Sequence, residues 1–314
     1  MKIRVATDLN RIDYIAQGPE VPKIAQDSTE SELLIQSYNN PVLLVDNARN
    51  GQLPSLKRDL LARLLEFPER TFEYDDVAVQ WSEMKYPGVW SPSIDTILFA
   101  NGLKQVLGQP TTVFRSFLEI GCGSGFLSKY ILELANRSGQ NIEYAQLMDI
   151  NPDALRCAKD NIGNLAENTK TDFTLNVPNA PLAVATAFDL VICNPPYVLR
   201  PNSNDNNPFE GLFLYGEILG KAKSLLKPNG QLIINFSSIS KDMVYPEYEK
   251  VFDMKKLNQL KVPLKIPVIT AGLSQASREW LAYLENNNRL TIDPKEQSGY
   301  RYWHTIEIVE CKLK

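Results

Sequence analysis

From about residue 114 onward, short apolar runs alternate with amphipathic stretches of helical length. This alternation is typical of a mostly parallel sheet with helices packed on its faces. The apolar runs predict strands at Phe114–Ile120, Ile142–Asp149, Lys170–Leu175, Phe188–Cys193, Gln231–Phe236, Leu257–Val268 and Tyr300–Cys311. Helical periodicity predicts helices at Phe126–Asn136, Pro152–Leu165, Gly211–Leu226, Tyr245–Met254 and Ser277–Glu285. The pattern therefore predicts an α/β fold.

The first 88 residues have a different pattern. Five leucines between residues 54 and 66 repeat at helical spacing, which predicts a helix that packs one face into a core. Residues 71–81 alternate enough to form a strand or hairpin, and Pro87-Gly88 marks a turn after them. We therefore expect a smaller, partly helical N-terminal domain at residues 1–88 and a larger domain at residues 89–314. Residues 201–208 are polar or turn-forming throughout and predict a mobile loop.

Composition narrows the classes of function. The chain has a single histidine, His304, which excludes sites with two histidine ligands and Ser-His-Asp hydrolases. Its four cysteines stand far apart and are expected to be reduced thiols. With no apolar run near the roughly 20 residues of a membrane helix and no signal peptide pattern, we expect a cytoplasmic protein without membrane contact.

Charge bears on the partners of the protein. The sequence holds 33 basic and 37 acidic residues, with a net charge of -4 and a pI of about 5.3. An acidic chain is not expected to bind nucleic acid over a large part of its surface, although a local basic patch would still allow such binding. Residues 198–208 carry one basic side chain, Arg200, which Asp205 offsets.

The run EIGCGSGF at residues 119–126 stands where a predicted strand meets a predicted helix. Glycines in such a turn let the main chain approach a ligand closely. The spacing G-x-G-x-G differs from the G-x-G-x-x-G of dinucleotide sites, and Glu119 suits a cationic ligand better than a pyrophosphate. The alternative is a tight turn that binds nothing.

Asp149 ends the next predicted strand. Ligands of open α/β sheets bind outside the carboxyl ends of the strands, and a carboxylate there can accept hydrogen bonds from both ribose hydroxyls. In the alternative interpretation Asp149 caps the following helix, although Asn151 and Asp153 are also available as caps.

The run NPPY at residues 194–197 follows the buried strand that ends at Cys193. Two prolines fix the main chain, so that the Asn194 side chain, the Pro195 carbonyl and the Tyr197 ring can surround one planar group. Asn194 and the carbonyl would accept its N–H bonds, and Tyr197 would stack on it. A proline-rich strand exit without a ligand is the structural alternative.

Together, EIGCGSG, the acidic end of the second strand and NPPY resemble the class I S-adenosylmethionine-dependent methyltransferases, in their amino-methylating branch. With GVWSPSIDT at residues 88–96 and the helix at residues 210–226, the chain is most similar to the HemK-type protein-glutamine methyltransferases, which modify translation release factors. The resemblance covers about residue 88 to the C-terminus. It implies a Rossmann-like fold with a seven-stranded, mostly parallel sheet, and S-adenosylmethionine as cofactor.

The resemblance also implies roles for individual residues. The loop of Gly121, Cys122, Gly123 and Gly125 would lie beneath the methionine part of the cofactor, with Glu119 at the floor. Asp149 would hold the ribose. The other side of the cofactor would be lined by Pro92, Asp95, Thr96 and Asn194. The acceptor would be held by Asn194, Pro195 and Tyr197.

Two departures from the family pattern stand out. The acidic residue usual after the third strand is missing, and Asn176 is the candidate to replace it. The segment at residues 266–301 is longer than the connection of a simple final hairpin, so the substrate surface is expected to differ from that of a release-factor enzyme.

The expected reaction is direct displacement of a methyl group by a substrate nitrogen, without a metal. A protein glutamine is the favoured acceptor, with a translation release factor as partner. The alternatives are an adenine-N6 methyltransferase of RNA or DNA, which the acidic pI disfavours, and a small-molecule N-methyltransferase. The glycine spacing disfavours a nicotinamide-dependent dehydrogenase. A non-catalytic adaptor would be expected to have lost the glycines or NPPY, and this chain has both.

Overall fold

The structure is a computed structural model. It describes residues 2–5, 14–17, 70–81, 85–89, 92, 94–109, 113–177, 180–198, 211–263, 275–292 and 302–314. The helix predicted at residues 54–66 and the loop predicted at 201–208 lie outside these ranges and stay predictions. The same holds for Trp90, Ser91 and Ser93 of the run at residues 88–96.

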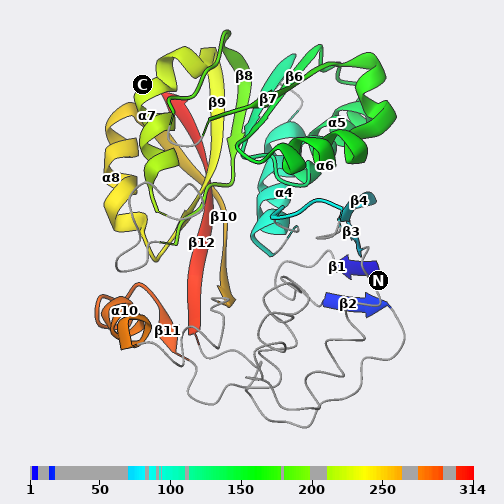
Figure 1. The fold of residues 1–314 in the computed structure, drawn as a ribbon. Helices are drawn as coiled ribbons and strands as arrows, with labels where there is room; N and C mark the ends of the chain where they lie inside the picture. Colours follow the sequence, from blue (N-terminus) through cyan, green and yellow to red (C-terminus); the bar gives the residue numbers. More distant parts are fainter. Residues whose placement is uncertain are drawn as a thin grey trace.

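The main sheet has the strand order β10-β12-β9-β8-β5-β6-β7, with β11 paired to β12 (Figure 1). Its parallel strands are β5 (Ser116–Ile120), β6 (Tyr144–Asp149), β7 (Lys170–Leu175), β8 (Phe188–Cys193) and β9 (Leu226–Ser237). The antiparallel strands are β10 (Phe252–Pro263), β11 (Thr291–Ile292) and β12 (Tyr302–Leu313). The predicted α/β fold with a mostly parallel sheet is confirmed.

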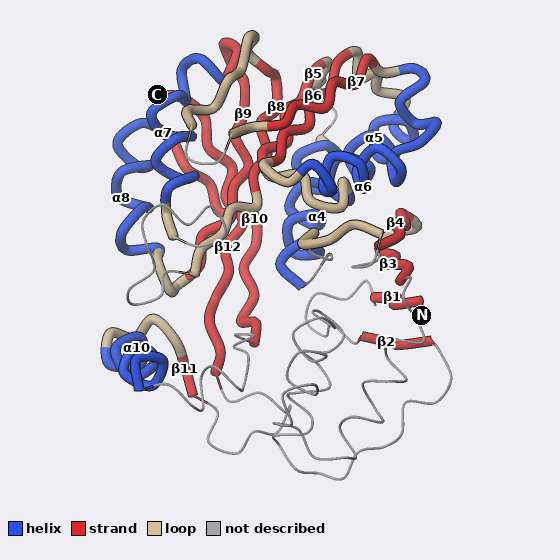
Figure 2. Tube along the Cα trace, in the orientation of Figure 1, coloured by secondary structure: helices blue, strands red, loops and turns tan. Residues whose placement is uncertain are grey.

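Helices cover both faces of this sheet (Figures 1 and 2). One face carries α4 (Ile94–Leu107), α5 (Phe126–Ser138) and α6 (Pro152–Ile162), which a short 3₁₀ helix η1 (Gly163–Asn168) extends. The other carries α7 (Phe213–Leu225) and α8 (Lys241–Val251). Phe117 and Leu118 illustrate the division, because these neighbours on β5 belong to two different hydrophobic cores. Strands buried on both faces read as continuous apolar runs, which explains why the sequence predicted them well.

Several elements of the structure differ from the sequence predictions. Helix α4 was not predicted, because its residues from Ile97 to Ala100 are all fully buried and show no polar stripe. Helix α8 ends at Val251, before the predicted end at Met254, since β10 begins at Phe252. The run KPNG at residues 227–230, whose proline, asparagine and glycine are typical of a turn, lies inside β9 as an irregularity of the pairing with β8, with Asn229 at φ 66°.

The hairpin predicted at residues 71–81 is present as β3 (Arg70–Tyr74) and β4 (Val77–Trp81). Asp75 and Asp76 form its turn, both with positive φ, as a two-residue hairpin turn requires. The hairpin joins the core beneath α4 and α5, where the rings of Phe72 and Phe126 meet edge to face at 5.0 Å. Strands β1 (Lys2–Val5) and β2 (Tyr14–Gln17) extend it to a four-stranded sheet. The boundary at residue 88 stays a prediction.

Helix α10 (Gln275–Asn286) lies in the long segment between β10 and β12, as the sequence predicted. Together with β11 it forms a small separate core, which includes Trp280 and Leu284 and in which Val198 is partly buried. The end of the NPPYV run therefore packs against this insertion.

The four cysteines are all free and buried. Among the described residues, none of the helices has the length and apolar character that crossing a membrane requires.

Candidate active site

The glycine loop lies between β5 and α5, and its three glycines have positive φ angles of 75°, 51° and 75°. The amides of Gly121 and Cys122 both donate to the Met148 carbonyl, at 2.8 and 3.0 Å, which ties the loop to the end of β6. A Cβ atom at Gly121 would meet nothing within 4 Å. Gly121 therefore has a main-chain conformation that favours glycine, and the space where a side chain would stand is open.

Gly125 serves a different purpose. A Cβ atom there would lie 2.7 Å from the Cα of Ala158 on α6, so the side chain is excluded by packing. Gly125 also precedes α5 as its N-terminal cap. The last glycine of the run thus allows two helices to approach each other, whereas Gly121 faces free space.

Asp149 accepts two main-chain hydrogen bonds, from Gly123 N and Asn151 N, both at 2.9 Å. Burial raises the pKa of the Asp149 carboxyl, against the effect of these hydrogen bonds. Asn151 accepts from Asp153 N and is itself the cap of α6, so Asp149 is not needed for that task. A carboxylate has about four lone-pair sites, so Asp149 can accept a further hydrogen bond from a ligand.

Glu119 is buried beneath the glycine loop, with 3% of its surface exposed. It accepts hydrogen bonds from both the amide and the hydroxyl of Ser128 on α5. Burial raises the pKa of Glu119 to about 8, so that the carboxyl is largely neutral at pH 7. A cation bound nearby would favour its ionised form.

The acceptor motif comes together with a distant segment. Asn194 follows β8, and its Nδ2 donates to Asp95 Oδ2 at 3.3 Å, across 99 positions of sequence. Asp95 stands in the first turn of α4, beside the half-buried Thr96, and Pro92 is buried just before that helix. Two predicted groups of site residues therefore meet at the carboxyl end of the sheet.

Tyr197 is partly buried, and its ring centre lies 5.4 Å from that of His304 on β12. His304 is itself buried, and its Nδ1 pairs with the Ser237 hydroxyl at 2.9 Å. Burial lowers the pKa of His304 to about 3, which keeps the ring neutral. It therefore supports the tyrosine and does not serve as a cationic or readily protonated group.

Asn176 follows β7 directly, and its main-chain N–H donates to the Asp149 main-chain carbonyl at 2.8 Å. Its neighbours Leu175 and Val177 are exposed by 55% and 64%. The residue that departs from the family pattern thus stands at the same sheet edge as Asp149.

Asn235 and Tyr215 were missed in the sequence. Asn235 is fully buried on β9, and its Nδ2 donates to Asn194 Oδ1. The Tyr215 hydroxyl on α7 reaches both the Asn235 carbonyl and its Oδ1, at 3.0 and 3.1 Å. A lone amide inside the apolar run IINF was the signal that could have revealed this pair.

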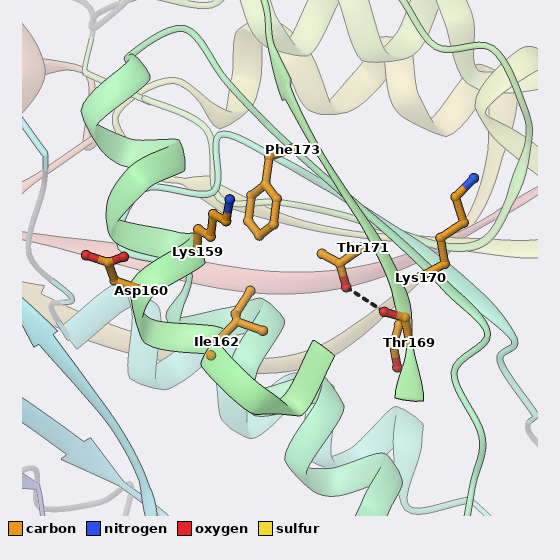
Figure 3. A pocket seen from close by; sticks show the side chains of 8 residues that line it. Lys159, Asp160, Ile162, Thr169, Lys170, Thr171 and Phe173 are labelled. Carbon is orange, nitrogen blue, oxygen red and sulfur yellow. Dashed lines mark hydrogen bonds between the residues drawn. The ribbon is translucent and has the colours of Figure 1, made fainter. Parts of the chain in front are cut away.

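A hollow in the surface lies apart from these residues. Figure 3 shows it between α6, which supplies Lys159, and β7, which supplies Thr171 and Phe173. Because Lys170 is the first residue of β7, this hollow lies toward the amino end of that strand. It is therefore separate from the edge at which Asp149 and Asn194 lie.

The family follows from a sequence comparison. The profile of the Methyltransferase small domain matches residues 85–260, more than half of the chain. The protein belongs to this methyltransferase family. The matched segment includes the glycine loop, Asp149, Asn194 and Asn235. The protein is a methyltransferase, and S-adenosylmethionine is its methyl donor.

Solved structures of other methyltransferases are distant. The ribosomal protein L11 methylase of Lactobacillus delbrueckii subsp. bulgaricus is 14% identical, with a TM-score of 0.41 over 73% of this chain and 83% of that one. The tRNA m1G37 methyltransferase of M. jannaschii is 14% identical, with a TM-score of 0.45 over 79% and 57%. The N-methyltransferase NodS of Bradyrhizobium japonicum, in complex with S-adenosyl-L-homocysteine, is 13% identical, with a TM-score of 0.40 over 69% and 86%. A search of curated protein sequences gave no match.

The residues of this methyltransferase fit the cofactor. A ribose needs an acceptor at the end of a strand, and Asp149 offers a carboxylate anchored by two main-chain amides. A bulky cationic ligand needs open space beside the main chain, which Gly121 provides, and a nearby carboxyl group whose ionised form the cation favours, which Glu119 provides.

Proposed function

We propose that this methyltransferase modifies the side-chain nitrogen of a protein glutamine, as the similar HemK-type enzymes do in translation release factors. The observation that carries the proposal is the Asn194 carboxamide, which hydrogen bonds hold at both ends directly after β8. A fixed carboxamide beside the Pro195 carbonyl suits an acceptor that brings two N–H bonds on a planar group.

The cofactor contacts follow from the geometry of the loop. We assign the ribose to Asp149 and the methionine part to the main chain at Gly121, Cys122 and Gly123. Glu119 supports this loop from below, and Gly125 shapes it through packing. The opposite wall is assigned to Pro92, Asp95, Thr96 and Asn194.

When bound, S-adenosylmethionine supplies an electrophilic methyl group on a sulfonium leaving group. The protein's part is to align the acceptor nitrogen with that methyl and to orient its lone pair. Asn194 Oδ1 and the Pro195 carbonyl accept the two N–H bonds, which favours the positive charge that develops on the nitrogen. Tyr197, supported by His304, stacks on the planar group. The released proton passes to water.

A protein acceptor is favoured over a nucleic acid by charge and by surroundings. The acidic pI gives no general attraction to phosphates. Val198, the first residue after NPPY, packs against the apolar core of α10 and β11. We propose that this insertion borders the acceptor route and contacts a folded protein.

The test uses extracts of cells that lack this protein, incubated with the purified enzyme and S-adenosylmethionine carrying a radiolabelled methyl group. We expect protease-sensitive label, identified by mass spectrometry as methylglutamine, and little change in rate between low and moderate salt. The Asn194→Ala variant is the control. Label in RNA or DNA as N6-methyladenine, with a rate that falls steeply with salt, would replace this proposal by the nucleic-acid alternative.

A further inference from the structure

Asn194 is held from inside the protein by the buried side chain of Asn235, which the buried Tyr215 contacts in turn. Strands β8 and β9 pair in parallel, with Cys193 opposite Ile234, so the next residues, Asn194 just after β8 and Asn235 within β9, are neighbours. Asn235 donates to Asn194 Oδ1, and Tyr215 reaches Asn235 from α7. We call the four residues Asp95, Asn194, Asn235 and Tyr215 the amide relay.

Chemistry fixes the direction of every hydrogen bond in the amide relay. The Asp95 carboxylate only accepts, so Asn194 turns its Nδ2 toward it and its Oδ1 toward Asn235. Asn235 must then offer its Nδ2, which leaves its own Oδ1 facing the Tyr215 hydroxyl as an acceptor. A flipped Asn194 carboxamide would set oxygen against the Asp95 carboxylate and NH₂ against NH₂.

We propose that Asn235 is a positioning residue that keeps Asn194 Oδ1 available as an acceptor, and that Tyr215 in turn holds Asn235. One lone pair of Asn194 Oδ1 accepts from Asn235, and the second serves the substrate. A flipped Asn194 would present an N–H donor to a substrate N–H donor and would lose that contact. The inference rests on the proposed function, in which Asn194 accepts a hydrogen bond from the methylated group.

The competing explanation is purely structural, with Asn235 present to satisfy a buried tyrosine hydroxyl. The chain offers a matched pair to separate the two. Tyr215 and Tyr248 are both fully buried in the same core, and the Tyr248 hydroxyl donates to the Tyr215 carbonyl at 2.8 Å. Both Tyr→Phe variants lose a buried hydroxyl, but only Tyr215→Phe interrupts the amide relay.

The first measurement is the rate of label transfer to extract protein, relative to the wild type at each pH. Asn235→Asp keeps the shape but donates only when its carboxyl is protonated, and burial raises the pKa of such a group. We expect a rate lowered about 100-fold at pH 8.5, partial recovery toward pH 6.5, and a dissociation constant for S-adenosylmethionine within about 2-fold of wild type. Tyr215→Phe should lower the rate about 3- to 10-fold, and Tyr248→Phe less than about 2-fold.

The second measurement is independent of the acceptor. In protein labelled with ¹⁵N at asparagine, the side-chain NH₂ signals of Asn194, assigned by their loss in Asn194→Ala, should shift in Asn235→Asp and Tyr215→Phe but not in Tyr248→Phe. If the wild type transfers no label to extract protein, the proposed function fails while these signals still test the amide relay. If Tyr215→Phe and Tyr248→Phe gave equal Asn194 signals and equal rates, the inference would be overturned. This comparison does not depend on whether Asn235→Asp folds.

Discussion

Glu119 and His304 are buried titratable groups whose pKa values move in opposite directions. Burial raises the pKa of Glu119 from 4.5 to about 8 and lowers that of His304 from 6.5 to about 3. In both cases the folded protein holds the neutral form, because burial disfavours the charged one. Their effects on stability therefore have opposite signs over different pH ranges.

Between pH 6.5 and 8, folded Glu119 keeps a proton that the unfolded chain has lost, while His304 is neutral in the folded state and largely neutral in the unfolded state. The free energy of unfolding should therefore fall as pH rises, by up to about 1.4 kcal/mol per pH unit for one proton. Between pH 4.5 and 6.5 His304 opposes this trend. Urea unfolding followed by tryptophan fluorescence at pH 6.5 and 8 measures the slope. Glu119→Gln should flatten it; an unchanged slope would show that Glu119 is not the group responsible.

Asn194 and Asp149 should separate chemistry from binding. Asn194→Ala removes an acceptor that matters in the transition state, so turnover should fall about 100-fold or more with cofactor affinity nearly intact. Asp149→Ala should instead weaken cofactor binding by about 1 to 3 kcal/mol per lost charged hydrogen bond. Calorimetry with S-adenosylmethionine and initial rates distinguish them, and similar behaviour of the two variants would refute the assigned roles.

At the scale of elements, the contact between α5 and α6 decides the shape of the glycine loop. Gly125 stands against Ala158 at this contact, while Gly139 ends α5 with open space around it. The two glycines have φ angles of 75° and 69°, so their conformations are alike and their surroundings differ.

This contrast gives a matched pair of variants. Gly139→Ala should cost about 1 to 2 kcal/mol for the positive φ alone. Gly125→Ala should cost about 1 to 3 kcal/mol more, because its Cβ would press on the Ala158 main chain. Denaturant unfolding measures both. Equal losses would mean that α6 moves aside freely and that Gly125 has no packing role.

At the scale of the whole molecule, the sheet separates two hydrophobic cores and places the candidate site residues at its carboxyl edge. Asp149 ends β6, Asn194 follows β8 and Asn235 lies on β9, and Asp95 comes from a helix on one face. A ligand held at this edge bridges several elements and should stabilise all of them together.

S-adenosylmethionine should therefore raise the melting temperature of the whole protein. At 100 times its dissociation constant a ligand adds about 2.7 kcal/mol, which is a shift of a few degrees for a chain of this size. Nicotinamide and flavin dinucleotides should give no shift, since the glycine spacing does not suit a pyrophosphate. A thermal melt with each ligand measures this; a shift with a dinucleotide and none with S-adenosylmethionine would contradict the cofactor assignment.

Much of the fold could be predicted from the sequence because apolar runs and turn residues are local signals. The strands ending at Ile120, Asp149, Leu175 and Cys193 all end where the sequence predicted. The three motifs are local signals of the same kind, since each is a short run of residues, and the roles assigned to them stay predictions. Helix α4 was not predicted, because a helix buried almost all around loses the periodicity that marks a surface helix.

The sequence by itself determined most of the order of elements in the sheet, the methyltransferase class and the chemical groups at the ends of the strands. Tertiary structure decided which groups meet: Asp95 with Asn194 across 99 positions, and Asn235 with both Asn194 and Tyr215. It also decided that Gly121 faces open space while Gly125 meets Ala158. The physical reason is that strand and turn preferences act between neighbours in the chain, whereas hydrogen-bond partners and close contacts depend on how the sheet and helices pack.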